Sequence, residues 1–310
     1  MHNHFLYKNA IKATIAILYF MLMTRTEAYA QERIDTLELE LSTVLGTAGE
    51  VPFWLHAQRN GIIDREGNYG YARDSAQSFL GKLGEISFSA EADFYSRLSV
   101  NSSAFFNQGY IQADWKGFEL YAGRKIDPLG IQDTSLSTGS MMQSRNAVPI
   151  PKIAVSTSGF LDVPGTGGWL GFKGYLAHGW FEADRIAENA YLHQKNIYLR
   201  FFRSENRFNA YAGFLHNVTW GGNHLRYGEL PQSFRDYIRV FLGKNIAEDS
   251  GYPGPEPGGT LGNTTAGYDT GITYDFGEYH ILAHRFFYLE DRPGLWFRNV
   301  WDGQWTVRLK

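Results

Sequence analysis

The sequence of 310 residues contains no cysteine. This absence excludes disulfide bonds, a lipidated N-terminal cysteine and any chemistry that needs a thiol. The chain also lacks a strong net charge, because 29 Lys and Arg against 32 Asp and Glu give a formal charge of -3. Such a balance provides no electrostatic argument for binding nucleic acid, and we expect no nucleic-acid partner.

Long apolar runs are missing as well. The run Ala13–Met23 is too short to cross a bilayer as a helix, which needs about 20 residues. Two lysines precede it, and a small-residue pattern ending at Ala30 follows it. A basic region, a short apolar region and an A-x-A pattern are typical of a secretory signal peptide. We therefore expect residues 1–30 to be cleaved and residues 31–310 to form one exported domain.

Aromatic residues are abundant, at 16% of the chain, and polar and apolar residues alternate over long stretches. Between Gly84 and Asn101, Glu91 and Asp93 fall on one side of an extended chain, and Phe88 and Phe94 fall on the other. Successive side chains of a strand point to opposite faces. This stretch therefore predicts one long strand with a charged face and an apolar face.

Similar alternating segments recur along the chain, and their connections alternate in length. Tight turns are expected near residues 116, 165, 205, 277 and 303, and longer connections at about 127–150, 182–192, 217–263 and 290–294. About twelve strands result. Short turns on one side and long loops on the other are typical of outer-membrane barrels, whose long loops lie outside the cell. We predict an all-β, transmembrane antiparallel β-barrel, with a soluble all-β sandwich as the alternative.

Two segments depart from the strand pattern. Leu230–Asn245 carries apolar residues at helical spacing, with Ser233 as a cap and Gly243 as a stop signal, which predicts a short helix in the longest loop, packed over a barrel mouth. Val51–Gly61 places Trp and Phe beside His and Arg, which favours a packed element just inside a barrel.

Three stretches together carry a family resemblance. They are "VPFWLHAQRNG" (Val51–Gly61), "GSMMQSRNAVPIPKI" (Gly139–Ile153), and a region from "YLHQKNIYLRF" through "GFLHNVTWGGNH" to "DYIRVFLGKN" (Tyr191–Asn245). In their order and spacing they resemble the capsule assembly Wzi family, in the form common among Bacteroidetes-type bacteria. The resemblance covers the chain from about residue 36 onward.

This resemblance implies an outer-membrane β-barrel of about eighteen strands, lectin-like and without enzymatic activity or cofactor, whose lumen is blocked by inward-folded loops. Its partners would be capsular or other surface polysaccharide and outer-membrane lipid, and we expect a monomeric barrel. Only about twelve strands are expected here, and "TVRLK" does not end on an aromatic residue. We therefore expect the chain to be a fragment of a longer gene product.

The long loop after the strand near 213–220 supplies the candidate glycan-binding residues. Saccharide sites combine a flat aromatic face with planar hydrogen-bonding groups. The candidates are Trp220, Asn223, His224, Arg226, Tyr227, Arg235, Tyr237 and Arg239. The alternative is that Trp220 and Tyr237 anchor the loop helix while Arg235 faces water.

Other chemistry has less support. His280 and His284 share a strand face, but four extended residues separate them by about 13 Å, which is too far to share one metal ion. Carboxylates such as Glu91 and Asp114 are expected to line a wet lumen rather than to form a catalytic pair. We expect no metal site and no enzyme, and keep a porin-like channel for small solutes as the alternative function. A barrel hydrolase is the third hypothesis.

Overall fold

The computed structural model describes residues 33–44, 50–65, 68–99, 102–127, 129–131, 139–183, 185–244, 262–289, 301 and 303–310. The expected signal peptide, and the strand expected before the turn near 303, lie outside these residues. Within the described ranges, no helix has the length and apolar character needed to cross a membrane.

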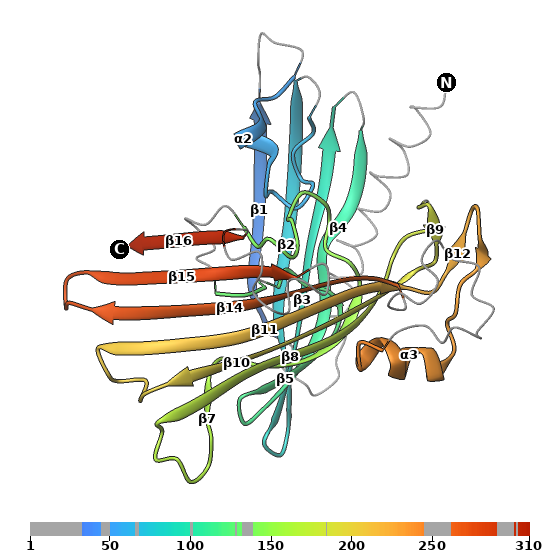
Figure 1. Cartoon of the computed structure of the whole chain (residues 1–310). Helices are drawn as coiled ribbons and strands as arrows, with labels where there is room; N and C mark the ends of the chain where they lie inside the picture. The colour runs from blue at the N-terminus through green and yellow to red at the C-terminus, as the bar shows by residue number, and fades with distance from the viewer. Residues whose placement is uncertain are drawn as a thin grey trace, which may run out of the picture.

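The described chain forms one antiparallel sheet of thirteen strands and a small sheet of three (Figure 1). The strands of the large sheet are β1 (Arg33–Val44), β2 (Tyr69–Leu83), β3 (Ile86–Leu98), β4 (Ser103–Trp115), β5 (Phe118–Arg124), β6 (Lys152–Thr157), β7 (Leu161–Asp162), β8 (Leu170–Trp180), β10 (Tyr191–Phe201), β11 (Phe208–Trp220), β14 (Asn263–Asp275), β15 (His280–Leu289) and β16 (Gln304–Leu309). The small sheet contains β9 (Ala187–Glu188), β12 (Asn223–His224) and β13 (Gly228–Glu229), and the helices are α2 (Phe53–His56) and α3 (Phe234–Phe241).

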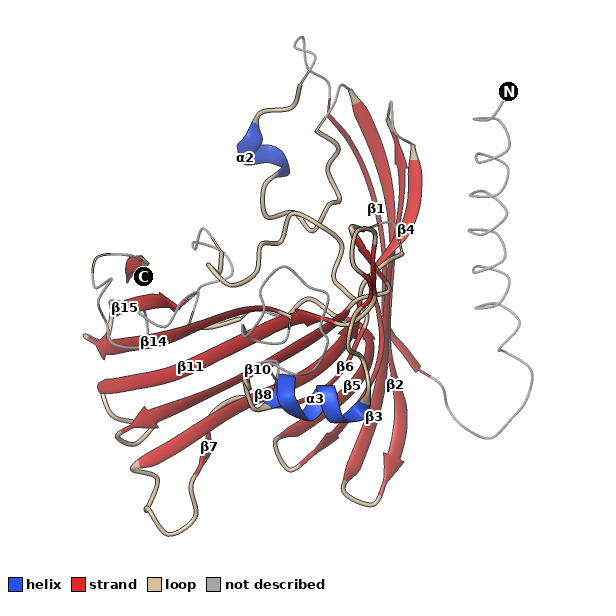
Figure 2. Ribbon diagram, turned by 45° about the vertical axis from the view of Figure 1, so that its right-hand side comes forward, coloured by secondary structure: helices blue, strands red, loops and turns tan. Residues whose placement is uncertain are grey.

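Strands of the large sheet pair in chain order, β1-β2-β3-β4-β5-β6-β8-β10-β11-β14-β15-β16, with β7 beside β8. The sheet bends strongly between the upright strands β1–β4 and the strands β8–β15, so that it encloses a concave side (Figure 2). Within the described residues, β1 and β16 are its two edges. The predicted antiparallel barrel-type fold is confirmed, as are the short turns between most of the expected strands.

The turn between β4 and β5 shows how the sequence sets these hairpins. Lys116 and Gly117 both have a positive φ, of 48° and 84°. A two-residue turn with both φ values positive matches the right-handed twist of the strands that it joins. It places Trp115 directly opposite Phe118.

The two faces of the sheet differ in chemistry. Cross-strand pairing aligns Ile111, Ala122, Ile153 and His178 in one row, which therefore shares one face. Ile111 and Ile153 are 59% and 51% exposed there. Other exposed apolar side chains on this outer face are Leu37, Leu39, Leu41, Leu120, Val155, Ile197, Ile272, Val307 and Leu309.

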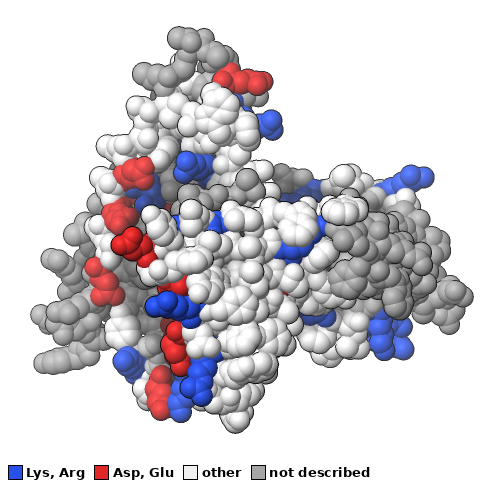
Figure 3. All heavy atoms as spheres, turned by 60° about the vertical axis from the view of Figure 1, so that its left-hand side comes forward, with Lys and Arg blue, Asp and Glu red and all other residues white. Residues whose placement is uncertain are grey.

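The opposite, concave face is polar. Its positions alternate with the exposed apolar ones and carry side chains such as Glu91, Gln112, Glu119 and Asn196. Seen from one side of the molecule, acidic and basic side chains intermingle in a column beside a broad area with few charges (Figure 3). An apolar convex face and a polar concave face are what the sequence alternation predicted.

Strand β2 was not expected from the sequence. Its outward positions carry Gly70, Ala72, Asp74 and Ala76, so the alternation that reveals the other strands is weak. Pairing with β1 and β3 on both sides holds it in the sheet. Tertiary pairing thus determined a strand that local hydrophobicity does not indicate.

The packed aromatic element expected at Val51–Gly61 is a different structure. Phe53 and Trp54 of α2 are 68% and 67% exposed. Gln58 and Asn60 hydrogen-bond to the segment 139–148, and Arg97 of β3 donates to the Gly61 carbonyl. Hydrogen bonds of backbone and side-chain groups, not aromatic packing, therefore position it.

Helix α3 forms where the sequence predicted it, with the expected cap. The Ser233 hydroxyl accepts a hydrogen bond from the Asp236 backbone N–H, and the Asp236 carboxylate accepts one from the Ser233 backbone N–H. This capping box satisfies donors at the helix start that have no partner within the helix. The helix does not cover the mouth of a barrel, however, because its side chains pack against the outer face of the sheet, at the start of β10 and the end of β11.

Candidate functional site

Ionisable groups on the concave face are joined in hydrogen-bonded sets. Arg73 of β2 lies 2.5 Å from the Asp93 carboxylate of β3 and 3.1 Å from Glu38 of β1. Asn107 of β4 donates to the second oxygen of Asp93. Side chains on neighbouring strands thus compensate one another, which lowers the cost of holding charges away from bulk water.

The segment after β5 crosses this polar face and is fixed at its start by charges. The Lys125 ammonium donates to Gln112, at 2.7 Å, and lies 3.4 Å from Glu119. The Asp127 carboxylate accepts hydrogen bonds from Lys152, at 3.0 Å, and from the hydroxyls of Tyr121 and Tyr175. Three strands therefore hold one carboxylate of the crossing segment.

The same segment is anchored at its other end by packing. Leu129 is buried with Tyr198, Leu215 and Phe286, all on the concave face. The Asp269 carboxylate accepts from the backbone N–H of residue 131, at 3.0 Å, and from the Tyr198 hydroxyl, at 2.9 Å. This apolar cluster inside a polar face fixes where the segment lies.

A second segment, residues 139–150, lies beside the first. Gln194 of β10 donates to Gln143 at 2.8 Å, and Asn217 of β11 donates to the Met142 carbonyl at 3.4 Å. Arg124 donates to the Pro149 carbonyl at 2.8 Å. Amides and a guanidinium from three strands thus hold a chain that has no regular structure of its own.

Two cavities flank residues 125–127. The first, of about 290 Å³, opens between the two crossing segments and the strands β10, β11 and β14. The second, of about 200 Å³, is lined by Glu119 of β5, Ser156 of β6 and Tyr175 of β8. Both are lined by Lys125, Ile126 and Asp127, so this short stretch forms the wall between them.

The lining of the first cavity suits a ligand rich in hydroxyl groups. Its polar side chains are Asn60, Lys125, Asp127, Gln143, Ser144, Arg145, Arg185, Gln194, Asn217, Thr219, Asn263 and Thr265. Amides, guanidinium groups and hydroxyls offer both donors and acceptors in fixed planes. Phe181 and Leu192 add apolar surface, which could meet the C–H side of a sugar ring.

The predicted residues Trp220 and Tyr237 lie together, but not as an open binding surface. Trp220 is 3% exposed and packs with Val218 and Val240, and its ring centroid lies 6.0 Å from that of Tyr237. Burial raises the pKa of the Tyr237 phenol above its ordinary value. These two aromatics anchor α3 to the sheet, which is the alternative that the sequence left open.

The predicted residues of the connection before α3 form a separate group. The His224 and Tyr227 rings lie tilted against each other with centroids 4.7 Å apart, and the Arg226 guanidinium lies 5.4 Å from the Tyr227 ring. Asn223 pairs in the small sheet with Glu188 and Glu229. This group presents an aromatic face with hydrogen-bonding partners. Its role in glycan binding stays a prediction.

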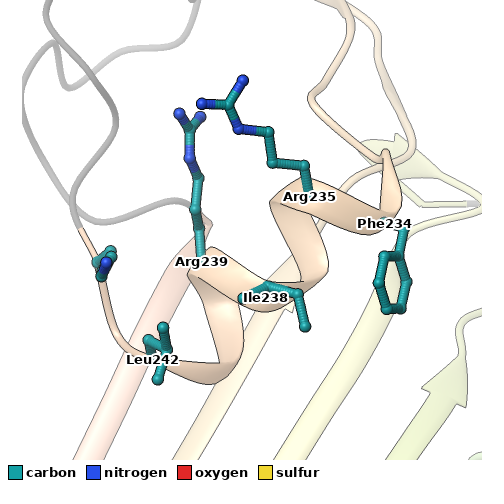
Figure 4. Close-up of a pocket in the computed structure, with 6 residues that line it drawn as sticks. Phe234, Arg235, Ile238, Arg239 and Leu242 are labelled. Carbon is teal, nitrogen blue, oxygen red and sulfur yellow. The ribbon is translucent and has the colours of Figure 1, made fainter.

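Arg235 and Arg239 lie on α3, away from both the cavities and the group at 223–227. They project together in one direction from the helix, whereas Phe234 and Ile238 point in another, and all four line one pocket with Leu242 and Lys244 (Figure 4). The structure therefore divides the eight predicted site residues among a buried anchor, a polar loop and a helix surface.

Sequence reasoning did not find the cavity residues Gln143, Gln194 and Asn217. Their signal was available, since Gln143 lies in a stretch that carried the resemblance and the other two occupy inward positions of β10 and β11. In the described part of the chain, no three His, Asp or Glu side chains come close enough to hold a metal ion.

Comparisons with known proteins do not identify a family. No family model and no curated protein matches the chain. Among solved structures, a triple mutant of the Rh. blastica porin is 10% identical, with a TM-score of 0.30, over 76% of this chain and 81% of that one. A double mutant of the same porin is 8% identical, with a TM-score of 0.31, over 82% of this chain and 85% of that one.

Pseudomonas aeruginosa OccK2 (OpdF) is 10% identical, with a TM-score of 0.29, over 87% of this chain and 65% of that one. Likenesses of this size carry no functional argument. The chain's own features define its class, which is an antiparallel barrel-type fold. These features are a continuous antiparallel sheet, an apolar convex face, and a polar concave face crossed by two segments.

Proposed function

We propose that this protein is an integral outer-membrane β-barrel protein that binds surface polysaccharide without a covalent step and takes part in capsule or surface-polysaccharide assembly. The observation that carries the membrane location is the set of exposed apolar side chains on the convex face, which includes Ile111, Ile153 and Ile197. Hydrocarbon would bury these side chains, and paired strands leave few backbone groups unsatisfied in lipid.

The glycan part of the proposal is supported by the polar cavity and by the resemblance to the Wzi family. The cavity is lined by planar hydrogen-bonding groups from elements far apart in the chain, among them Asn60, Gln143 and Asn217. Two segments cross the concave face. A lumen filled in this way favours holding a polymer over passing small solutes.

Binding is tested with the full chain in detergent micelles and with capsular polysaccharide isolated from the producing cells. We expect Gln143→Ala and Asn217→Ala each to weaken binding about tenfold, because a ligand hydroxyl would lose a partner. Ser204→Ala, in the exposed turn between β10 and β11, is the matched control and should bind as the parent does. Binding that is unchanged in all three variants would contradict a site in the cavity.

The same preparation separates the loop group and the channel alternative. Binding that survives both cavity changes but is lost in Tyr227→Ala would place the glycan on the residues 223–227. Liposome swelling measures solute passage, and we expect almost none from a lumen filled by the two segments. Rapid swelling with small sugars, without polysaccharide binding, would instead support the porin-like channel.

A further inference from the structure

The side of α3 that faces away from the sheet is chemically divided. Tyr237, Val240 and Phe241 pack toward the sheet. Phe234, Ile238 and Leu242 form an exposed row at i, i+4 and i+8, and Phe234 is 78% exposed. Arg235 and Arg239 form a second row at i and i+4 beside it (Figure 4), and Lys244 follows the helix in the sequence.

The face of the sheet under α3 is the apolar outer one. Pairing places His193 of β10 opposite His178 and Val218, and His178 opposite the exposed Ile153. His193, Lys195 and His216 therefore interrupt the apolar face near the strand ends. Helix α3 covers this interruption, since the rings of Tyr237 and Phe241 lie 5.6 and 5.5 Å from that of His193.

Lys195 binds the C-terminal end of the helix. Its ammonium donates to the Phe241 carbonyl and lies 4.5 Å from the centre of the Phe241 ring. A cation at the C-terminal end of a helix satisfies a free carbonyl and interacts favourably with the helix dipole. The helix thus covers the polar side chains on the convex face and exposes its own apolar row of Phe234, Ile238 and Leu242 there.

Helix α3 also lies close to one end of the strands. It packs beside the start of β10 and the end of β11, where the long connections lie. Trp220 ends β11, and His216 is four residues before it, or about 13 Å along the strand. The helix therefore lies at the rim of the apolar face, where hydrocarbon gives way to headgroups.

We propose that α3 is a membrane-interface helix that inserts Phe234, Ile238 and Leu242 into lipid and binds the phosphate of lipid headgroups through Arg235, Arg239 and Lys244. The inference rests on the proposed outer-membrane location. Within the described residues Arg239 has one acidic neighbour, Asp236, at 3.6 Å, which already serves the helix cap. Guanidinium groups bind phosphate oxygens through paired hydrogen bonds, and an apolar row beside a basic row is typical of helices that lie in the interface.

The absence of cysteine allows a direct test of depth. A spin label on Ile238→Cys is compared with labels on Ile197→Cys, on the apolar face of β10, and on Ser204→Cys, in a short turn. The full chain is reconstituted in vesicles of phosphatidylcholine with one fifth phosphatidylglycerol. We expect labels at 238 and 197 to be relaxed more by oxygen than by a water-soluble nickel complex, and the label at 204 to behave oppositely.

The outcomes separate the two proposals. A label at 197 in lipid with a label at 238 in water would overturn the interface helix and leave the membrane location standing, whether or not another macromolecule binds α3. A label at 197 in water would overturn the membrane location itself. The labelled variants must first match the parent in gel mobility before and after heating, so that misfolding is not counted as an outcome.

Headgroup recognition is tested by native mass spectrometry of the detergent-solubilised chain with added phosphatidylglycerol. We expect Arg235→Gln with Arg239→Gln to lower the affinity for this lipid by roughly fivefold for each charge removed. Arg226→Gln, in the same connection but outside α3, is the matched control. An equal loss in the control, or no loss in the double variant, would overturn phosphate binding by α3.

Discussion

Asp127 and Lys152 meet on the concave face at 3.0 Å, and the Lys152 side chain is 2% exposed. The Asp127 carboxylate also accepts from Tyr121 and Tyr175. A buried ammonium without a partner is expensive, because the desolvation cost is no longer offset. A single carboxylate therefore supports both the crossing segment and the wall between the two cavities.

We expect Asp127→Ala to lower the free energy of unfolding by about 3 kcal/mol, since it leaves the Lys152 charge buried and unpaired. The control is Lys116→Ala, which removes the exposed pair with Glu85 and should cost about 1 kcal/mol or less. Heat-induced loss of the compact gel mobility in detergent measures both. Equal effects of the two changes would show that the buried pair contributes no more to the free energy of unfolding than the exposed pair does.

Glycine is required at one position of the sheet for two reasons. Gly123 of β5 has a φ of 130°, and a Cβ placed there would lie 2.1 Å from the Gly109 carbonyl oxygen of β4. Neither the backbone conformation nor the space suits a side chain. At Gly174 of β8, by contrast, an added Cβ would meet nothing within 4 Å, and φ is not positive.

Gly123→Ala should therefore lower the free energy of unfolding by about 1–3 kcal/mol for the strained backbone alone, with the clash adding to it. Gly174→Ala should be neutral or slightly stabilising, because it reduces the freedom of the unfolded chain. Refolding yield into detergent micelles and heat stability provide the comparison. A loss of similar size in both variants would contradict the conformational argument.

At the scale of the element, α3 combines a local signal with a long-range one. Its start is set by Ser233 and Asp236, which are three residues apart and could be recognised in the sequence. Its place is set by Trp220, Tyr191 and His178, which belong to three different strands. Local sequence therefore determines where the helix begins, and tertiary contacts determine where it packs.

Ser233→Ala should weaken the helix by about 1 kcal/mol, because donors at its start lose their partner. Hydrogen exchange of the α3 amides should become roughly fivefold faster, while amides of β10 and β11 keep their protection. Ser204→Ala, in an exposed turn, should change neither. Unchanged exchange in α3 would mean that packing on the sheet alone maintains the helix.

At the scale of the whole molecule, the two faces of the sheet decide which environment each side can meet. Ile197 and Asn196 are neighbours in β10 and point to opposite faces. Ile197 is 52% exposed on the apolar convex face, whereas Asn196 lines the second cavity. The pair offers a matched comparison of lipid with a wet lumen.

Ile197→Arg should disfavour folding into lipid vesicles by about 2–4 kcal/mol, since a charge would enter the hydrocarbon. Asn196→Arg should cost much less, because an inward charge can meet water and acidic neighbours such as Glu119, which lines the same cavity. Folding equilibria in vesicles, followed by gel mobility, give both values. If the inward change were the more costly one, the apolar convex face would not be the lipid-facing one.

The sequence by itself determined which side chains share a face, where several tight turns fall and where α3 begins, because alternation and caps act between residues near in the chain. It did not reveal β2, whose outward residues are small, nor the exposure of Phe53 and Trp54. Only the tertiary structure decided that α3 packs on the convex face and that Asn60, Gln143 and Asn217 line one cavity. Those contacts join segments distant in sequence, and no local pattern records the pairing or the packing that brings them together.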